Sequence, residues 1–181
     1  MRIISGDFGG RRFSPPADNW PTRPTTDVAK EGLFNILQNQ LDFGEIKMLD
    51  LFGGSGSHTY EALSRGCRDV TYVDRFAPAL KYTAGILSDL KMAEFVKLHR
   101  KDALRFVQKC GEHFDYIFAG PPYGMPRLDE IPDLVSQQNL CSPGGLFVLE
   151  HNANHYFAEH PDFEVERSYG GTRFSFFRKT G

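Results

Sequence analysis

The stretch from Phe114 to Gly124 ends an apolar run in a stiff loop. Its segment Tyr116-Ile-Phe-Ala119 has the length and the aromatic and β-branched character of a buried strand. Gly120-Pro-Pro-Tyr123 follows, and the two prolines remove backbone donors and fix φ, so the chain must leave the sheet there. Open α/β sheets bind their ligands at the carboxyl ends of parallel strands. We therefore predict a ligand site at this loop, beside Tyr123.

A glycine-rich turn and two acids follow three other predicted strands. The turn is Asp50-Leu-Phe-Gly-Gly-Ser-Gly56, where the missing Cβ atoms let backbone amides approach a ligand. Asp74 stands 20 residues after Gly54, at the end of the next strand, where an acid accepts hydrogen bonds from a ribose diol. Asp102 ends the third strand, at a place suited to an adenine amino group. Each acid alone could be a helix N-cap, but the three features together indicate an adenosyl ligand.

The same turn argues against a dinucleotide. The chain has Gly54-x-Gly56-x-x-Thr59, so the third glycine of the dinucleotide fingerprint is absent. Asp50 would also sit poorly beside a pyrophosphate. An adenosyl compound with a cationic amino-acid tail, S-adenosylmethionine, fits these acids better. A nicotinamide oxidoreductase is therefore the most distant of the functions that we considered.

Strands that alternate with helices position these residues. The expected strands cover residues 47–52, 69–74, 95–99, 116–119 and 145–150; the expected helices lie within 25–40, 57–66, 77–87, 102–107 and 129–139; residues 163–167 and 172–177 form a closing hairpin. This order predicts an α/β fold with a mostly parallel, doubly wound sheet and an antiparallel edge.

Residues 1–24 differ from the rest and are predicted to form an N-terminal arm, with residues 25–181 as the main domain. Two short strands could flank a glycine-rich turn in the arm, and a proline-rich run follows. The arm is locally basic and is either a solvated hairpin or a surface that grips phosphates. The candidate phosphate contacts are Arg2, Arg11, Arg12, Arg23 and Lys30.

Composition adds only broad limits. The 181 residues carry a net charge of −2, so no global basic field points to nucleic acid. Three widely spaced cysteines without a CxxC pair argue against a disulfide framework and a cysteine zinc site, and we expect no bound metal. No stretch approaches 18 apolar residues, and the first residues lack the apolar core of a signal peptide. We therefore expect a cytoplasmic protein without membrane contact.

Taken together, these motifs resemble a known family. The glycine turn, the acid after the second strand and the proline loop look like those of class I methyltransferases that methylate exocyclic amines. Over nearly its full length the chain resembles the RsmD-like family, which methylates a guanine N2 in bacterial small-subunit ribosomal RNA. The resemblance rests on Thr22-Arg-Pro-Thr-Thr-Asp27, Leu33-Phe-Asn-Ile-Leu37, Asp50-Leu-Phe-Gly-Gly-Ser-Gly56, Glu61-Ala-Leu-Ser-Arg-Gly66, Asp74, Pro121-Pro-Tyr123 and the closing Tyr169-Gly-Gly-Thr-Arg173.

The resemblance implies a Rossmann-like fold with a seven-stranded sheet, a small N-terminal β-hairpin extension and S-adenosylmethionine as cofactor. The substrate would be 16S rRNA within an assembling small subunit, and the protein would act as a monomer. Catalytic roles would fall to Gly120, Pro121, Pro122 and Tyr123. The implied cofactor contacts, from the methionine end to the adenine, are Asp50, Phe52, Gly53, Gly54, Gly56, Asp74, Arg75, Asp102 and Ala103.

Position 120 departs from the family pattern, which is Asp or Asn, two prolines and an aromatic residue. Gly120 leaves backbone carbonyls, notably its own and that of Pro121, and water to accept hydrogen bonds from the amine. A lost charge-assisted hydrogen bond is worth roughly 1.5–3 kcal/mol, so we hypothesise a methyl transfer slower by about ten- to hundred-fold than with the acid. Two alternatives stay open: a non-catalytic protein that binds cofactor and RNA in ribosome assembly, and an enzyme that methylates a protein amide or a small-molecule amine.

The residues after the glycine turn also depart from the family, which has small and apolar residues there. The chain instead has Ser57 and His58. We expect Ser57 to cap the helix, and we expect His58 to lie on the helix surface rather than to make a polar contact near the cofactor.

Overall fold

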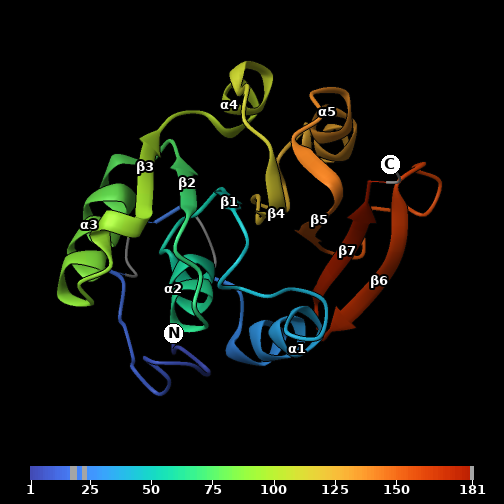
Figure 1. Ribbon diagram of the computed structural model, residues 1–181. Coiled ribbons are helices and arrows are strands. Elements are labelled where there is room, and N and C mark those ends of the chain that lie inside the picture. The colour runs from blue at the N-terminus through green and yellow to red at the C-terminus, as the bar shows by residue number, and fades with distance from the viewer. Residues whose placement is uncertain (17–19, 22–23, 180–181) are drawn as a thin grey trace.

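Seven strands form one mixed sheet, and helices cover both of its faces (Figure 1). The computed structural model describes residues 1–16, 20–21 and 24–179. In that part of the chain, no helix is long and apolar enough to cross a membrane. The elements in chain order are α1 (Asp27–Leu37), β1 (Met48–Leu51), α2 (Ser57–Ser64), β2 (Val70–Asp74), α3 (Ala77–Asp89), β3 (Val96–Arg100), α4 (Ala103–Lys109), β4 (Phe114–Ala119), α5 (Ile131–Gln137), β5 (Cys141–His151), β6 (Phe163–Tyr169) and β7 (Thr172–Arg178), with short 3-10 turns at Ala93–Phe95 and Leu128–Glu130.

The sheet grows in two directions from β1. The strand order is β3-β2-β1-β4-β5-β7-β6. β1 pairs in parallel with both β2 and β4, and β3 and β5 continue the parallel part on either side. β7 pairs antiparallel with both β5 and β6. The prediction of an α/β fold with a mostly parallel sheet and an antiparallel C-terminal hairpin is confirmed.

Some element boundaries differ from the sequence expectation. α1 ends at Leu37, because the N–H groups of Asn39 and Gln40 bond to the carbonyls three residues back, those of Ile36 and Leu37, instead of four residues back. β5 begins at Cys141, four residues earlier than expected, because an irregular register lets it pair as far back as Phe114 of β4. These differences lie away from the strand ends that carry the predicted site.

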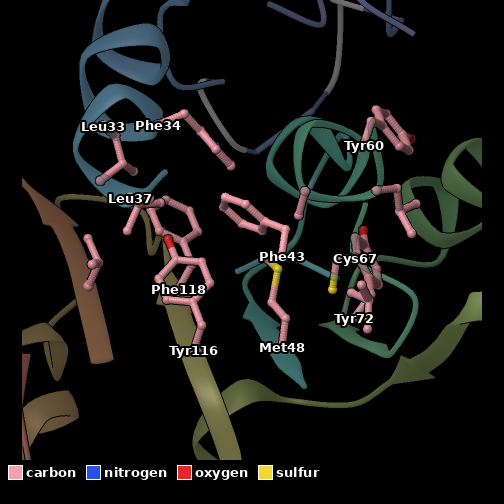
Figure 2. Packing of buried hydrophobic residues seen from close by; sticks show 14 of the residues in the cluster. Leu33, Phe34, Leu37, Phe43, Met48, Tyr60, Cys67, Tyr72, Tyr116 and Phe118 are labelled. Carbon is pink, nitrogen blue, oxygen red and sulfur yellow. The ribbon is translucent and has the colours of Figure 1, made fainter. Parts of the chain in front are cut away.

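Alternate side chains of the central strands enter two hydrophobic cores. On β4, Tyr116 and Phe118 pack into the core that contains α1, α2 and α3 residues, whereas Ile117 and Ala119 pack against α4 and α5. Figure 2 shows the first core, where side chains of α1 face those of β1 and β4. Because the central strands β1, β2 and β4 are buried on both faces, their sequences are mostly apolar, and this burial fixes where each of them ends.

A buried carboxylate attaches the N-terminal segment to the domain. Glu61, on α2, is fully buried and accepts hydrogen bonds from the backbone N–H groups of Ile4 (2.8 Å) and Ser5 (3.1 Å). Lys30 of α1 is also buried, with its Nζ 3.4 Å from Glu61, and Arg65 donates to the same carboxylate. The first residues of the chain therefore lie over α2.

Within this segment Arg2 and Arg12 form one antiparallel bridge. The segment also bonds to Ser64 at the end of α2, which accepts from the N–H groups of Asp7 and Phe8. In the described part of the arm, the expected hairpin is present as this bridge, its turn and backbone hydrogen bonds that join Met1 to Phe13 and Ile3 to Gly10 and Arg11. The division of the chain at residue 24 stays a prediction.

Replacing Lys30 by methionine should lower the free energy of unfolding by about 3 kcal/mol, because the buried charge of Glu61 would keep only Arg65 as a counter-ion. Methionine keeps most of the aliphatic stem, so the loss reports on the ammonium group, which also donates to the Arg2 carbonyl and the Ser57 hydroxyl. Urea unfolding at constant pH measures it.

Lys47→Met is the matched control, since Lys47 pairs with Glu112 on the surface and such pairs contribute at most about 1 kcal/mol. Equal losses in the two variants would contradict a special role for the buried pair.

Candidate functional site

The glycine turn and the proline loop leave the sheet side by side. Leu51, the last residue of β1, lies opposite Ala119, the last residue of β4. From there the chain runs through α2 to β2 on one side and through α5 to β5 on the other. The N–H of Gly120 donates to the Leu51 carbonyl (3.2 Å) and joins the two segments. This is the topological switch point at which doubly wound sheets bind ligands.

Two adjoining cavities open at this switch point. The first, of about 550 Å³, is lined by Asp50 and the start of the glycine turn, and by the proline loop. The second, of about 660 Å³, is lined by Asp74 and Asp102. Phe52 and Pro122 line both, so together the cavities form one cleft. The structure therefore brings together predicted residues from the ends of four strands.

The predicted residues divide between the two cavities. Gly56 lines neither; it takes a positive φ of 79° at the start of α2, close against Tyr60. Those that line the first cavity are Asp50, Phe52, Gly53, Gly54, Gly120, Pro121, Pro122 and Tyr123. Those that line the second are Phe52, Asp74, Arg75, Asp102, Ala103 and Pro122.

Close packing and two hydrogen bonds hold the glycine turn in place. A Cβ atom added to Gly53 would lie 2.1 Å from the ring of Tyr72, so only glycine fits there. The Tyr72 hydroxyl donates to the Gly54 carbonyl (2.6 Å). Phe52 has a positive φ of 59°, an uncommon conformation for an aromatic residue that is often found at functional sites. The turn is thus a rigid wall of the cleft.

Asp74 is buried and stabilises the same turn. Its carboxylate accepts hydrogen bonds from the N–H groups of Gly54 and Phe76, both at 2.8 Å. Asp102 accepts from the N–H of Arg105 (3.0 Å) and so caps α4, the role that an isolated acid would have there. Both acids nevertheless line the second cavity, and Arg75 is exposed at its rim.

Asp50 lies buried beneath the glycine turn. Its carboxylate accepts a hydrogen bond from the Thr59 hydroxyl (2.7 Å). Burial raises the pKa of Asp50 from 3.8 to about 7, and the nearby charge of Asp74 acts in the same direction. A carboxylate in this position favours a cationic group in the first cavity, because such a group would offset the cost of burying the charge.

The proline loop is held from both sides of Tyr123. The Tyr123 hydroxyl donates to Glu150 Oε1 (2.7 Å), and the Tyr123 carbonyl accepts from His155 Nε2 (3.1 Å). His155 in turn contacts Asp129. Pro121 is buried and Tyr123 is half-buried, so the tyrosine ring is both anchored and accessible from the cavity.

Glu150 and His58 line the first cavity and were not among the predicted site residues. Glu150 is buried at the end of β5, and the sequence offered a signal for it, namely an acid at the carboxyl end of a predicted strand. For His58 the expectation of a surface position was wrong. Its ring stacks on Phe118 with centroids 3.7 Å apart, and Nε2 lies 2.8 Å from the Tyr116 hydroxyl.

The physical reason is that α2 has no solvent-exposed face. All eight residues of α2 are buried, between the sheet, α1 and the N-terminal segment. Burial lowers the pKa of His58 well below its usual value, so the ring is neutral. Ser57 does not cap α2 either: Gly56 is the N-cap residue, and the Ser57 hydroxyl accepts from Lys30.

The predicted phosphate contacts differ in their exposure. Arg11 and Arg12 are exposed, while Arg2 is partly buried. Lys30 is buried in its pair with Glu61, so the prediction that it contacts phosphate was wrong. Arg23 lies outside the described residues. Arg2 and Arg12 face each other across their bridge, where like charges repel in the absence of an anion.

Comparison with known proteins identifies the family. The model of the family described as "Conserved hypothetical protein 95" matches residues 1–178. The chain belongs to this family. YlbH of Bacillus subtilis, a candidate rRNA methyltransferase, is 34% identical over the full length of both chains. Ribosomal RNA small subunit methyltransferase D of Haemophilus influenzae is 33% identical over 83% of this chain and 78% of its own. The resemblance to the RsmD-like family is confirmed.

Solved structures agree with this assignment. The candidate methyltransferase yhhF of Escherichia coli has a TM-score of 0.86 at 26% identity, over 99% of this chain and 98% of its own. A Thermus thermophilus 16S rRNA N2 G1207 methyltransferase in complex with AdoMet and guanosine has a TM-score of 0.69 at 19% identity, over 88% of this chain and 45% of its own. The second likeness concerns the fold alone. The expected Rossmann-like class I methyltransferase fold is confirmed.

Asp50→Asn should make the protein more stable at high pH but not at low pH. The pKa of Asp50 is raised in the folded state, so the folded protein holds this proton more tightly than the unfolded chain does. The resulting stabilisation is complete below about pH 4 and is lost as the pH rises through about 7. At pH 8 the variant should exceed the wild type by on the order of 3 kcal/mol.

Urea unfolding of both proteins between pH 4 and 8 measures this difference. Other shifted groups, such as His58, occur in both proteins and cancel in the comparison. Parallel stability curves over this range would contradict the raised pKa.

Proposed function

We propose that this protein transfers a methyl group from S-adenosylmethionine to the exocyclic N2 amine of a guanine in small-subunit (16S) ribosomal RNA. The observation that carries the proposal is the divided cleft. The second cavity, lined by acids at the ends of β2 and β3, meets the first cavity, bounded by the proline loop, at Phe52 and Pro122. Relatives named as rRNA methyltransferases support methylation of ribosomal RNA.

The residues of the cleft fit S-adenosylmethionine in charge and in shape. Asp50 would hold the cationic methionine end, and Gly53 and Gly54 leave room for it because no Cβ atom intervenes. Asp74 would bind the ribose and Asp102 the adenine, beside Arg75 and Ala103. When bound, the cofactor supplies a methyl group activated by its sulfonium charge.

The first cavity would receive the guanine. An exocyclic amine is a poor nucleophile, since its lone pair is delocalised into the base, and positioning at near-attack distance supplies much of the rate. The Tyr123 ring would stack on a flipped base. The Pro121 carbonyl would accept one N–H of the amine. Because the loop is anchored by Glu150 and His155, the base would meet a pre-organised surface.

The RNA would extend from this cavity over the N-terminal segment. Arg11 and Arg12 are exposed there and carry charge suited to phosphates. We propose that the protein acts in the cytoplasm, as a monomer, on RNA within an assembling small subunit. The main alternative is a non-catalytic binder of cofactor and RNA, and the observation that favours it is Gly120 in place of the family's acid.

Incubation with methyl-labelled S-adenosylmethionine and unmodified small-subunit particles tests the proposal. The RNA is digested to nucleosides and the labelled nucleoside is identified by chromatography. We expect label in N2-methylguanosine. Label in another nucleoside would overturn the guanine N2 assignment, and label in protein would indicate amide methylation. Cofactor binding without any transfer, to particles or to free RNA, would support the non-catalytic alternative.

Tyr123→Ala should slow single-turnover methyl transfer by about 10- to 100-fold, because base stacking on an aromatic ring is worth roughly 1–3 kcal/mol. Tyr123→Phe keeps the ring but loses the hydrogen bond to Glu150, so it should lie between the two. Calorimetry with S-adenosylhomocysteine should give the same affinity for all three proteins. An alanine variant as fast as the wild type would contradict the stacking role.

The double variant Arg11→Ala/Arg12→Ala should weaken RNA binding and reduce its salt dependence. Loss of two phosphate contacts lowers the slope of log K against log salt by about 1.5 to 2. Filter binding at several salt concentrations measures the slope. Lys109→Ala is the matched control, because Lys109 is exposed on α4, which packs on the other face of the sheet. A slope unchanged in the double variant would remove these arginines from the RNA interface.

A further inference from the structure

Glu150 fills the space next to the position where the family's acid is missing. Leu149 of β5 lies opposite Ala119 of β4 in a parallel pair, so Glu150 and Gly120 follow at the same height. A Cβ atom added to Gly120 would lie 3.8 Å from Glu150 Oε2. Both residues line the first cavity. A carboxylate is therefore present here, although it comes from the neighbouring strand.

Two hydroxyl groups hold this carboxylate in place. Tyr123 donates to Oε1 (2.7 Å), and Thr25, just before α1, donates to Oε2. An ionised carboxylate offers about four acceptor positions, so two remain after these bonds. The donors come from segments on either side of the cavity mouth, which fixes the carboxylate against the cavity wall.

Burial of the Glu150 carboxylate costs free energy, and the surrounding fold does not offset this cost with an opposite charge. Glu150 is 5% exposed, and among the described residues no lysine, arginine or histidine forms an ion pair with it. Burial raises its pKa, and the two hydroxyl groups only partly oppose this. A raised pKa makes the carboxylate a stronger proton acceptor. Buried acids of this kind, in a cleft, mark functional sites.

We propose that Glu150 is the catalytic acceptor for the exocyclic amine and replaces the acid that is absent at position 120. This inference rests on the proposed amine methylation. One N–H of the amine donates to the Glu150 carboxylate. The nitrogen lone pair forms the bond to the methyl carbon, and the carbon–sulfur bond of the sulfonium donor breaks with its electron pair left on sulfur. The nitrogen then gives its extra proton to Glu150, which releases it to solvent.

Variants that move the carboxylate from position 150 to position 120 test this assignment. Glu150→Gln keeps the shape and one of the two acceptor oxygens but cannot take the proton, so single-turnover transfer should fall by about 100-fold. Gly120→Asp alone should also lower the rate, because two carboxylates in one site cannot both ionise readily. The double variant Gly120→Asp/Glu150→Gln should transfer at least about ten times faster than Glu150→Gln. Glu164 lies on β6 and forms an exposed ion pair with Arg178, so the control variant Glu164→Gln should transfer the methyl group at the wild-type rate.

A binding measurement gives a second readout that does not depend on turnover. Guanosine carries the 2-amino group and inosine lacks it. With S-adenosylhomocysteine present, the wild type should bind guanosine about tenfold more tightly than inosine, and in Glu150→Gln this preference should be smaller, because a neutral amide oxygen is a weaker acceptor than a carboxylate. If Glu150 only anchored Tyr123, Glu150→Gln would weaken the binding of both nucleosides alike. An acid at position 120 would then not restore methyl transfer.

The outcomes separate this inference from the proposed function. If the wild type labels no guanine N2 in particles or RNA, the proposed function fails. If the wild type labels guanine N2 and Glu150→Gln is equally fast, the proposed function stands and the role of Glu150 is refuted. A Gly120→Asp variant faster than the wild type would also refute the role of Glu150, because such a gain would show that the wild-type cavity has no effective acid.

Discussion

The parallel pairing of β1 with β4 is the constraint on which the cleft depends. Because Leu51 lies opposite Ala119, the two strands end at the same height, and the chain turns away from them on opposite sides. The pairing of the backbones alone therefore places the glycine turn beside the proline loop. β5 extends the same edge through its pairing with β4, which brings Glu150 to the cavity. Burial on both faces makes this register costly to change.

Four buried carboxylates on this framework differ in how their charge is balanced. Glu61 has Lys30 and Arg65, and Asp74 has two backbone N–H groups. Asp50 and Glu150 accept from hydroxyl groups, and no ion pair to either is found in the described part of the chain. Burial raises the pKa of both. The two acids that the fold balances least are the two that line the first cavity, which is expected of groups meant to meet a ligand.

The sequence predicted the strands, their order and the acids at their ends, because apolar runs and glycine turns are local signals. It could not predict which polar residues are buried by distant parts of the chain. Lys30 looked like a surface cation because Glu61 reaches it from another helix. His58 looked exposed because nothing near it shows that the N-terminal segment covers α2. Such burial depends on packing between elements, which spacing does not record.

The same limit explains why Gly120 was interpreted as a loss. A sequence motif records only which residue occupies a position, whereas binding of the amine depends on where acceptor oxygens lie in space. Ala119, the last residue of β4, lies opposite Leu149 of β5, so the residue that follows either of them could supply an oxygen to the same space. An acid at position 120 beside Glu150 would place two carboxylates in one buried site, where one would be forced to stay protonated. Glycine at position 120 avoids that conflict, and Glu150 makes the acid there unnecessary, so each residue accounts for the other.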